Sequence, residues 1–161
     1  MRIVKLLALS FLMGLPNVVQ AAMLSFGGTS NGEDPVEIKS ENLTVNQETG
    51  QAIFVGDVIV VQGELRVYAP RITVDYAETN GKTEIDTVTA MGGTTVVNGA
   101  ESAEASRMVY SLKQSEIVMT GQVIAVNGPT TVTGDQMVVD TRSGNAEMSG
   151  NVKTILNAGA S

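Results

Sequence analysis

The chain has 161 residues, of which 43% are hydrophobic, so it is long and apolar enough for one domain with a buried core. It contains no His and no Cys, which excludes Ser-His and Cys nucleophiles, disulfides and the usual zinc ligand sets. Its net charge of −7, aromatic content of 4% and lack of Trp argue against a nucleic-acid-binding surface.

Residues 1–21 have the composition of a secretory signal peptide. Arg2 and Lys5 precede an apolar run that ends at Leu15, and small residues follow near Ala21. The run is shorter than the roughly 20 residues that a membrane span needs, so a retained anchor is the less favoured alternative. Cleavage before Ala22 removes two of the 10 basic residues and none of the 17 acidic ones, which leaves a net charge of −9.

Residues 22–35, which include the Gly-rich stretch 27–35, are expected to form a flexible linker. From there to Leu156 the chain is rich in Val, Ile and Thr, and short alternating runs are separated by Gly, Asn and Asp. This pattern is typical of successive β-strands, and no stretch has convincing helical spacing. We therefore expect one all-β domain over residues 36–156 and a short tail over residues 157–161.

Two sequence markers repeat along this domain. A small residue followed by apolar residues three and five positions later occurs at Ser40, Ala69, Ala105 and Gly134. A Gly followed two positions later by Val or Thr occurs at Gly56, Gly92, Gly121 and Gly150. Each marker returns after 29 residues, except for one interval of 36. We infer about four 29-residue repeats, one of them enlarged by seven residues, and the polar stretch 78–84 predicts a loop there.

Alternation with a period of two assigns apolar side chains to one shared face. Phe54, Val58 and Val60 alternate with residues of the opposite face, and the pattern returns 65 residues later at Met119. Val152 extends the same face. We expect a ligand-binding groove made of Val36, Ile38, Leu43, Val45, Phe54, Val58, Leu65, Val67, Ile72, Val74, Met108, Tyr110, Ile117, Met119, Val123, Val132, Met137, Val139 and Met148. Its methionines suit an irregular apolar ligand because their side chains are unbranched, although they suit a ligand-free core equally well.

Four carboxylates are candidates for catalysis by an acid–base pair: Asp57, Asp75, Asp135 and Asp140. Asp75 and Asp140 occupy equivalent repeat positions just after predicted strands, where Asp commonly accepts hydrogen bonds from turn amides. The other acidic residues are too scattered for calcium-binding turns. The sequence therefore predicts no enzyme, no catalytic residue, no metal site and no cofactor.

A recognisable pattern runs through residues 36–41, 52–63 and 65–69, and it returns in residues 103–110, 117–123 and 132–137. Together these segments resemble the OstA-like family of periplasmic lipopolysaccharide-transport bridge proteins, the LptA family. The resemblance covers residues 36–156. Its most specific element is Gly-Asp-Val followed by Gln-Gly within residues 56–63, and partial recurrence in register strengthens it.

The resemblance implies an open, twisted β-jelly roll, or β-taco, that is V-shaped in section and holds lipid A acyl chains between its two sheets. It implies a periplasmic lipopolysaccharide-binding protein that bridges the two membranes and passes its cargo along an apolar groove towards outer-membrane assembly. An LptC-like inner-membrane partner would bind the N-terminal edge, an LptD-like outer-membrane partner the C-terminal edge, and copies would associate head to tail.

Two other interpretations stay open. An LptC-like transfer protein would share the fold but keep residues 1–21 as a membrane anchor. A structural β-solenoid would have the same repeats with a filled core and no lipid ligand. In either case the edges near residues 36–45 and 148–156 carry no evident polar cap or proline guard, which favours association with another chain.

Overall fold

The computed structural model describes residues 35–157. The expected signal peptide, linker residues 22–34 and tail residues 158–161 lie outside the described residues. Within the described range, no helix is long and apolar enough to cross a membrane. The strands are β1 (Glu37–Lys39), β2 (Asn42–Asn46), β3 (Gln51–Gln62), β4 (Leu65–Thr79), β5 (Lys82–Asn98), β6 (Glu101–Ser111), β7 (Glu116–Asn127), β8 (Thr130–Asp140), β9 (Ala146–Ser149) and β10 (Lys153–Leu156).

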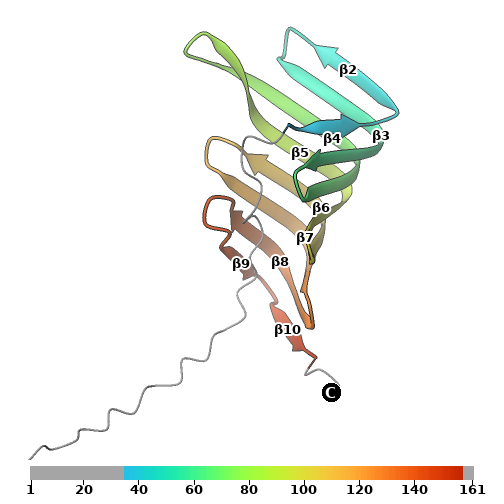
Figure 1. Cartoon of the computed structure of the whole chain (residues 1–161), viewed down its shortest axis with the longest axis vertical. Helices are drawn as coiled ribbons and strands as arrows, with labels where there is room; N and C mark the ends of the chain where they lie inside the picture. The colour runs from blue at the N-terminus through green and yellow to red at the C-terminus, as the bar shows by residue number, and fades with distance from the viewer. Residues whose placement is uncertain (1–34, 158–161) are drawn as a thin grey trace, which may run out of the picture.

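The strands form one antiparallel sheet in which strands consecutive in the chain lie side by side (Figure 1). The order is β1-β3-β4-β5-β6-β7-β8-β10, while β2 also pairs with β3 and β9 also pairs with β8. Each edge of the sheet therefore consists of two short segments, β1 with β2 at one edge and β9 with β10 at the other. The predicted all-β fold is confirmed.

Every long strand bends where the pairing register shifts by one residue, and β4 and β5 have a second shift, between Asp75 and Tyr76. Between β3 and β4 the shift lies between Val55 and Val58, and equivalent shifts occur in each pair through β7 and β8. In each of these pairs the extra residue belongs to β3, β5 or β7. A β-bulge bends its strand and increases the local twist. Bulges aligned across neighbouring strands therefore fold the sheet along one line, which we call the crease.

Both repeated sequence markers lie on the crease. The glycine marker, with positive φ, stands in each bulged strand and in the break between β9 and β10: Gly56, Gly92, Gly121 and Gly150. The small-residue marker lies on the adjacent strands, where Val58 pairs with Ala69 and Thr94 pairs with Ala105. At Gly121 the requirement for glycine is also steric, because a Cβ there would lie 2.7 Å from Ser106 Oγ.

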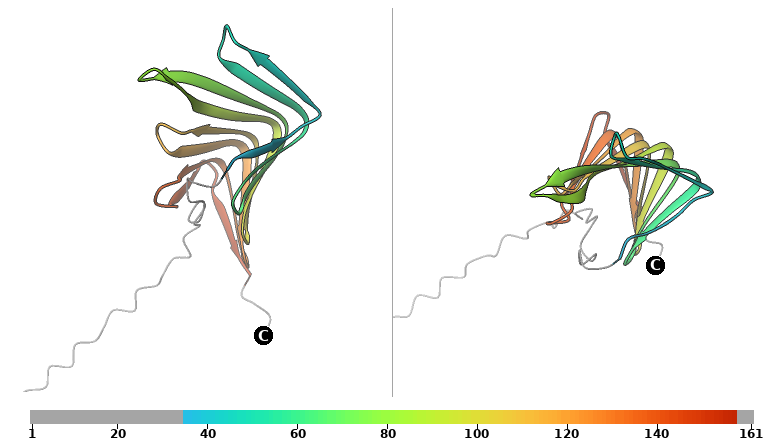
Figure 2. Two further views of the ribbon diagram at one scale, coloured as in Figure 1. Left: turned by 45° about the horizontal axis from the view of Figure 1, so that its top comes forward. Right: turned by 90° about the horizontal axis from the view of Figure 1, so that it is seen from above.

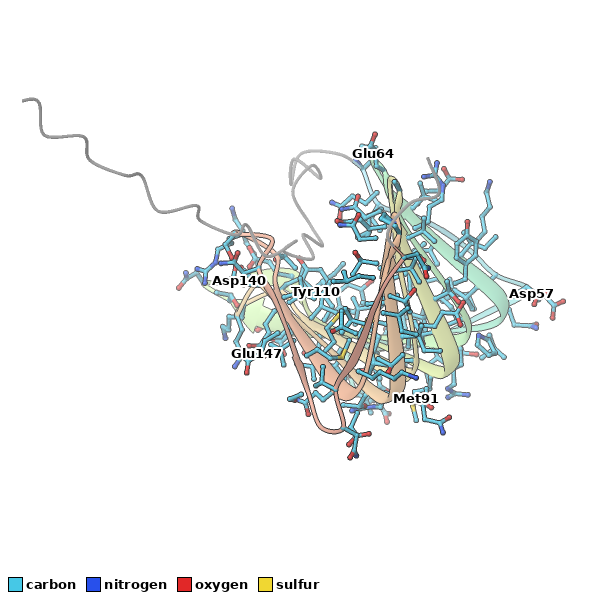
Figure 3. All side chains as sticks on the ribbon, turned by 90° about the horizontal axis from the view of Figure 1, so that it is seen from below. Asp57, Glu64, Met91, Tyr110, Asp140 and Glu147 are labelled. Carbon is cyan, nitrogen blue, oxygen red and sulfur yellow. The ribbon has the colours of Figure 1, made fainter. Side chains whose placement is uncertain are left out.

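The crease gives the sheet a V-shaped section (Figure 2). In Figure 3, Tyr110 lies between the two arms, Met91 lies outside the vertex, and Glu64 and Asp140 lie at the ends of the arms. We call arm A the half that ends at the β3–β4, β5–β6 and β7–β8 turns. Arm B is the half that ends at the β4–β5, β6–β7 and β8–β9 turns. The buried core lies on the concave face, between the arms.

The loop predicted for residues 78–84 is wrong, because the seven extra residues lengthen the hairpin of β4 and β5. Pairing continues from Tyr76 with Ile85 to Thr79 with Lys82, and only Asn80 and Gly81 form the turn. Asn-Gly with positive φ at both positions is a favoured two-residue hairpin turn. Most side chains in the extension are exposed, so its strands lack the apolar alternation by which a half-buried strand is recognised.

Candidate functional site

The concave face is built from cross-strand rows, because directly paired residues of neighbouring strands point to the same side of a sheet. One row runs along arm B beside the crease and crosses the whole sheet. This methionine row consists of Leu43, Phe54, Ile72, Ala90, Met108, Met119, Met137 and Met148. Met108, Met119 and Met137 are buried and adjacent, so two neighbouring repeats contribute unbranched side chains to one surface.

Two further apolar rows complete the face. The outer row of arm B consists of Val45, Ala52, Val74, Val88, Tyr110, Ile117, Val139 and Ala146. The row of arm A consists of Ile38, Val60, Val67, Val96, Ala103, Ala125 and Val132. Val58 and Val123 lie buried at the crease, and Val36 and Leu65 line the interior of arm A. All the residues predicted for the groove are thus on the concave side, and their contact with a lipid stays a prediction.

An apolar cavity of about 230 Å³ lies between the arms. Ile72 and Tyr110 line it from arm B, and Ile38 and Val67 line it from arm A. A larger hollow of about 660 Å³ lies over the bulges, and glycines and polar residues such as Ser106 form most of its lining. Because that lining offers little apolar surface, the cavity between the arms is the better site for an apolar ligand.

The concave face is open at the N-terminal edge of the sheet. Leu43 and Val45, on β2, are 56% and 61% exposed, although each pairs with a residue of the interior rows. At the other edge, Val152 and Leu156 are also exposed. The exposure follows from position, because no further strand within residues 35–157 covers either edge.

Several interior residues were missed by the sequence pattern. Alanines make up most of them: Ala52, Ala69, Ala90, Ala103 and Ala105 are each at most 7% exposed. Alanine has little preference for either side of a surface, so it weakens an apolar pattern. The missed valines Val88 and Val96 belong to β5, where adjacent Gly92 and Gly93 interrupt the alternation. Val88 pairs with Val74, and Val96 lies an even number of residues further along the same strand. Strand pairing and counting in steps of two would therefore have found both.

Three of the four candidate carboxylates accept hydrogen bonds within the fold. Asp140 accepts backbone N–H bonds from Arg142 and Ser143, both at 2.9 Å, so its expected turn role is confirmed. The hydrogen bonds from the Ser143 and Arg142 amides lower the pKa of Asp140 below its ordinary value. The same expectation for Asp75 is wrong, because β4 continues past it and Asp75 accepts a side-chain bond from Gln51 instead. No group of three or more acidic residues among residues 35–157 could hold a metal ion.

Comparison with known proteins gives concordant results. Residues 37–145 match a family model described as LptA/(LptD N-terminal domain) LPS transport protein. An uncharacterised protein of Rhizobium meliloti is 28% identical over 124 residues, which are 73% of this chain and 67% of the relative. The lipopolysaccharide export system protein LptH of Pseudomonas aeruginosa is 25% identical over 149 residues, which are 88% and 82% of the two chains. The Escherichia coli protein LptA is 23% identical over 127 residues, which are 75% and 68%.

The fold also matches a solved structure. The crystal structure of LptH from Pseudomonas aeruginosa, described as the LptA-homologous periplasmic component of a lipopolysaccharide transport device, aligns with a TM-score of 0.70 at 18% identity. The alignment covers 80% of this chain and 99% of that one. The predicted open β-jelly roll is therefore confirmed.

Proposed function

Since the chain belongs to the LptA/(LptD N-terminal domain) family of LPS transport proteins, we propose that it is a non-enzymatic carrier that holds lipopolysaccharide by its acyl chains between the two arms. It works in the periplasm, after cleavage before Ala22, and passes its cargo from the inner towards the outer membrane. The observation that carries the proposal is the continuous apolar concave face.

The chemistry of this face suits acyl chains. Each methylene removed from water contributes about 0.8 kcal/mol, so a few tails between the arms offset much of the cost of leaving a bilayer. Tyr110 is the only aromatic residue besides Phe54 in the three apolar rows, and no charged side chain belongs to them. Binding thus depends on aliphatic contact, which does not require a fixed ligand shape.

The direction of the rows suits transport. Each row crosses the strands from one edge of the sheet to the other, and neighbouring strands lie about 4.8 Å apart. A tail that moves along the methionine row exchanges one long apolar side chain for a similar one at each step from Met108 to Met148. Such a surface holds a tail without a deep local minimum of free energy that would trap the tail at one position.

The edges suit head-to-tail association. The first and last of the eight strands along the sheet run in opposite directions, so β9 and β10 of one copy meet β2 and β1 of the next as antiparallel neighbours. The crease also continues. The extra residue belongs to β9–β10 against β8, whereas β1–β2 lack it against β3. The alternation of bulged and unbulged strands is therefore preserved at the junction. An LptC-like partner at the N-terminal edge and an LptD-like partner at the C-terminal edge would pair in the same way.

Site-specific photocrosslinking tests the groove. A photoreactive phenylalanine replaces Phe54 or Tyr110 in the exported protein, and Ile124 is the matched control, since it lies beside buried Val123 but is 41% exposed on the convex face. We expect lipopolysaccharide adducts at the first two positions and none at the third. Equal labelling at all three, or none anywhere, would contradict the groove, and sequencing the mature N-terminus separates a soluble carrier from an anchored LptC-like protein.

A further inference from the structure

The two arms have different inner margins. The last inward-facing row of arm A, which we call the polar row, consists of Gln62, Asn98, Glu101, Asn127 and Thr130, interrupted by Leu65. Each of these residues lies two positions from a member of the apolar row of arm A, so it faces the same side. The margin of arm B is mixed instead: Ile85 and Leu112 line the cavity there, and Asp86 and Lys113 lie beside them. Within residues 35–157, the row that carries amide side chains thus belongs to arm A.

The polar row follows the internal repeat. Gln62, Asn98 and Asn127 each stand immediately before the glycine of a two-residue turn, at intervals of 36 and 29 residues, which are the intervals of the two repeat markers. The amide side chain therefore returns in three repeats at the same structural position. The row is a regular feature of arm A, as the methionines are of arm B.

The chemistry of the row is neutral hydrogen bonding with one carboxylate. Asn127 Nδ2 donates to Glu101 Oε1 at 2.5 Å, and Thr130 is only 8% exposed. A carboxamide has two N–H groups and an acceptor oxygen, so the bond to Glu101 uses only one of the two N–H groups of Asn127. The segments 62–65, 98–101 and 127–130 contain no Lys or Arg. Hydroxyl and amide groups match this surface, whereas a phosphate finds no cation in these segments.

We propose that the polar row binds the hydroxyl and amide groups of the sugar headgroup of a glycolipid whose acyl chains lie on the apolar rows. The inference rests on the proposed carrier function and adds to it which arm faces the headgroup. The ligand then lies across the groove in one orientation, with its sugar over arm A and its tails towards the crease and arm B. The row repeats along the groove, so the headgroup keeps equivalent contacts as the lipid advances.

The test compares two ligands on a double variant. Asn98→Val with Asn127→Val removes two of the three amides of the row and puts residues that favour β-strands in their place. Ser102→Val with Thr131→Val is the matched control, because these residues lie on β6 and β8, which pair with the strands of Asn98 and Asn127, and face the convex side. Affinities are measured for purified lipopolysaccharide and for a fluorescent fatty acid without a sugar. We expect the first variant to bind lipopolysaccharide about tenfold more weakly and the fatty acid equally well, while the control binds both like the original protein.

The other outcomes are distinct. Unchanged lipopolysaccharide affinity in a folded Asn98→Val, Asn127→Val variant overturns the inference, and so does an equal loss for both ligands, which indicates a distorted groove. If the unaltered protein and the variant bind lipopolysaccharide equally well at high salt, ionic contacts rather than neutral hydrogen bonds cause the difference in affinity. The inference then fails. If the unaltered protein binds neither ligand, the proposed carrier function itself is wrong.

Discussion

Thr94 is an isolated polar group inside the apolar core. It is 2% exposed at the crease, and its hydroxyl has no hydrogen-bond partner among the described residues. Its pairing partner Ala105 is small and offers no hydrogen-bonding side chain. A buried hydroxyl without a partner costs free energy of folding, because the bonds that it makes to water in the unfolded chain are lost.

Replacing Thr94 by Val is therefore expected to stabilise the protein. The two side chains have the same shape, and the change removes the unpaired hydroxyl, so the free energy of unfolding should rise by about 1 kcal/mol. Urea denaturation measures this, with Thr95→Val as a control on the convex face, where a change of less than about 0.5 kcal/mol is expected. A loss of stability in Thr94→Val would show that the hydroxyl has a bonding partner, such as an ordered water molecule.

At the level of the strands, the crease is the feature on which the shape of the groove depends. One extra residue in each of β3, β5 and β7 turns what would be a twisted open sheet into two arms. The crease requires backbone conformations that few residues adopt, and it brings Gly121 close to Ser106, whose hydroxyl donates to the Gly121 carbonyl at 3.1 Å. Two glycines of the crease separate the conformational requirement from the steric one.

Gly93→Ala and Gly121→Ala form the comparison. Gly93 has a φ of 94° and open space at the Cβ position, so alanine there carries only the conformational cost, about 1–3 kcal/mol. Gly121 has a similar φ of 84°, but its Cβ would meet Ser106, so we expect Gly121→Ala to lose about 1–3 kcal/mol more. The midpoints of urea unfolding measure the difference. In a Ser106→Gly background, the difference in stability between the two alanine variants should be smaller. If the difference persists there, the clash with Ser106 is not its source.

The sequence was sufficient to predict the inward face of some strands but not of others. In β3 and β7 the large apolar residues alternate on both sides of the bulge, from Phe54 to Val60 and from Met119 to Val123, so the inward face could be predicted. In β5 it could not, because Gly92 and Gly93 have no side chains to show which face they are on. The hairpin extension was missed because water covers both its sides, and only the Asn80-Gly81 turn marked it as paired.

At the level of the whole molecule, the repeat predicted a stacked apolar interior but not the angle at which the two arms enclose it. Sequence spacing shows that hairpins recur, yet the angle between the arms depends on the bulges, and the two broken edges depend on Ser40–Glu41 and Gly150–Asn151. Which residues bind cargo also depends on this angle. A flatter sheet with the same alternation would expose the methionine row to water.

Head-to-tail association makes a specific prediction about register. If the rows continue between copies, Leu43 of one copy pairs with Met148 of the next, as directly opposed residues whose Cα atoms lie about 4.5–5.5 Å apart. The chain contains no cysteine, so Leu43→Cys with Met148→Cys should give disulfide-linked ladders on oxidation, read on a non-reducing gel. Thr44→Cys with Met148→Cys is the control, since Thr44 faces the convex side. Ladders from both variants, or from neither, would contradict this register.

The broken edges also restrict which chains can join the sheet. An exposed edge invites pairing with any extended chain, which is a route to aggregation. Here a straight intruding strand can follow only one edge segment, of three to five residues, before the edge turns away from it at the crease. A partner that pairs along both segments must carry the same bend at the same place. The break therefore selects partners that have a matching crease. It protects the open ends of the groove from other chains without closing them.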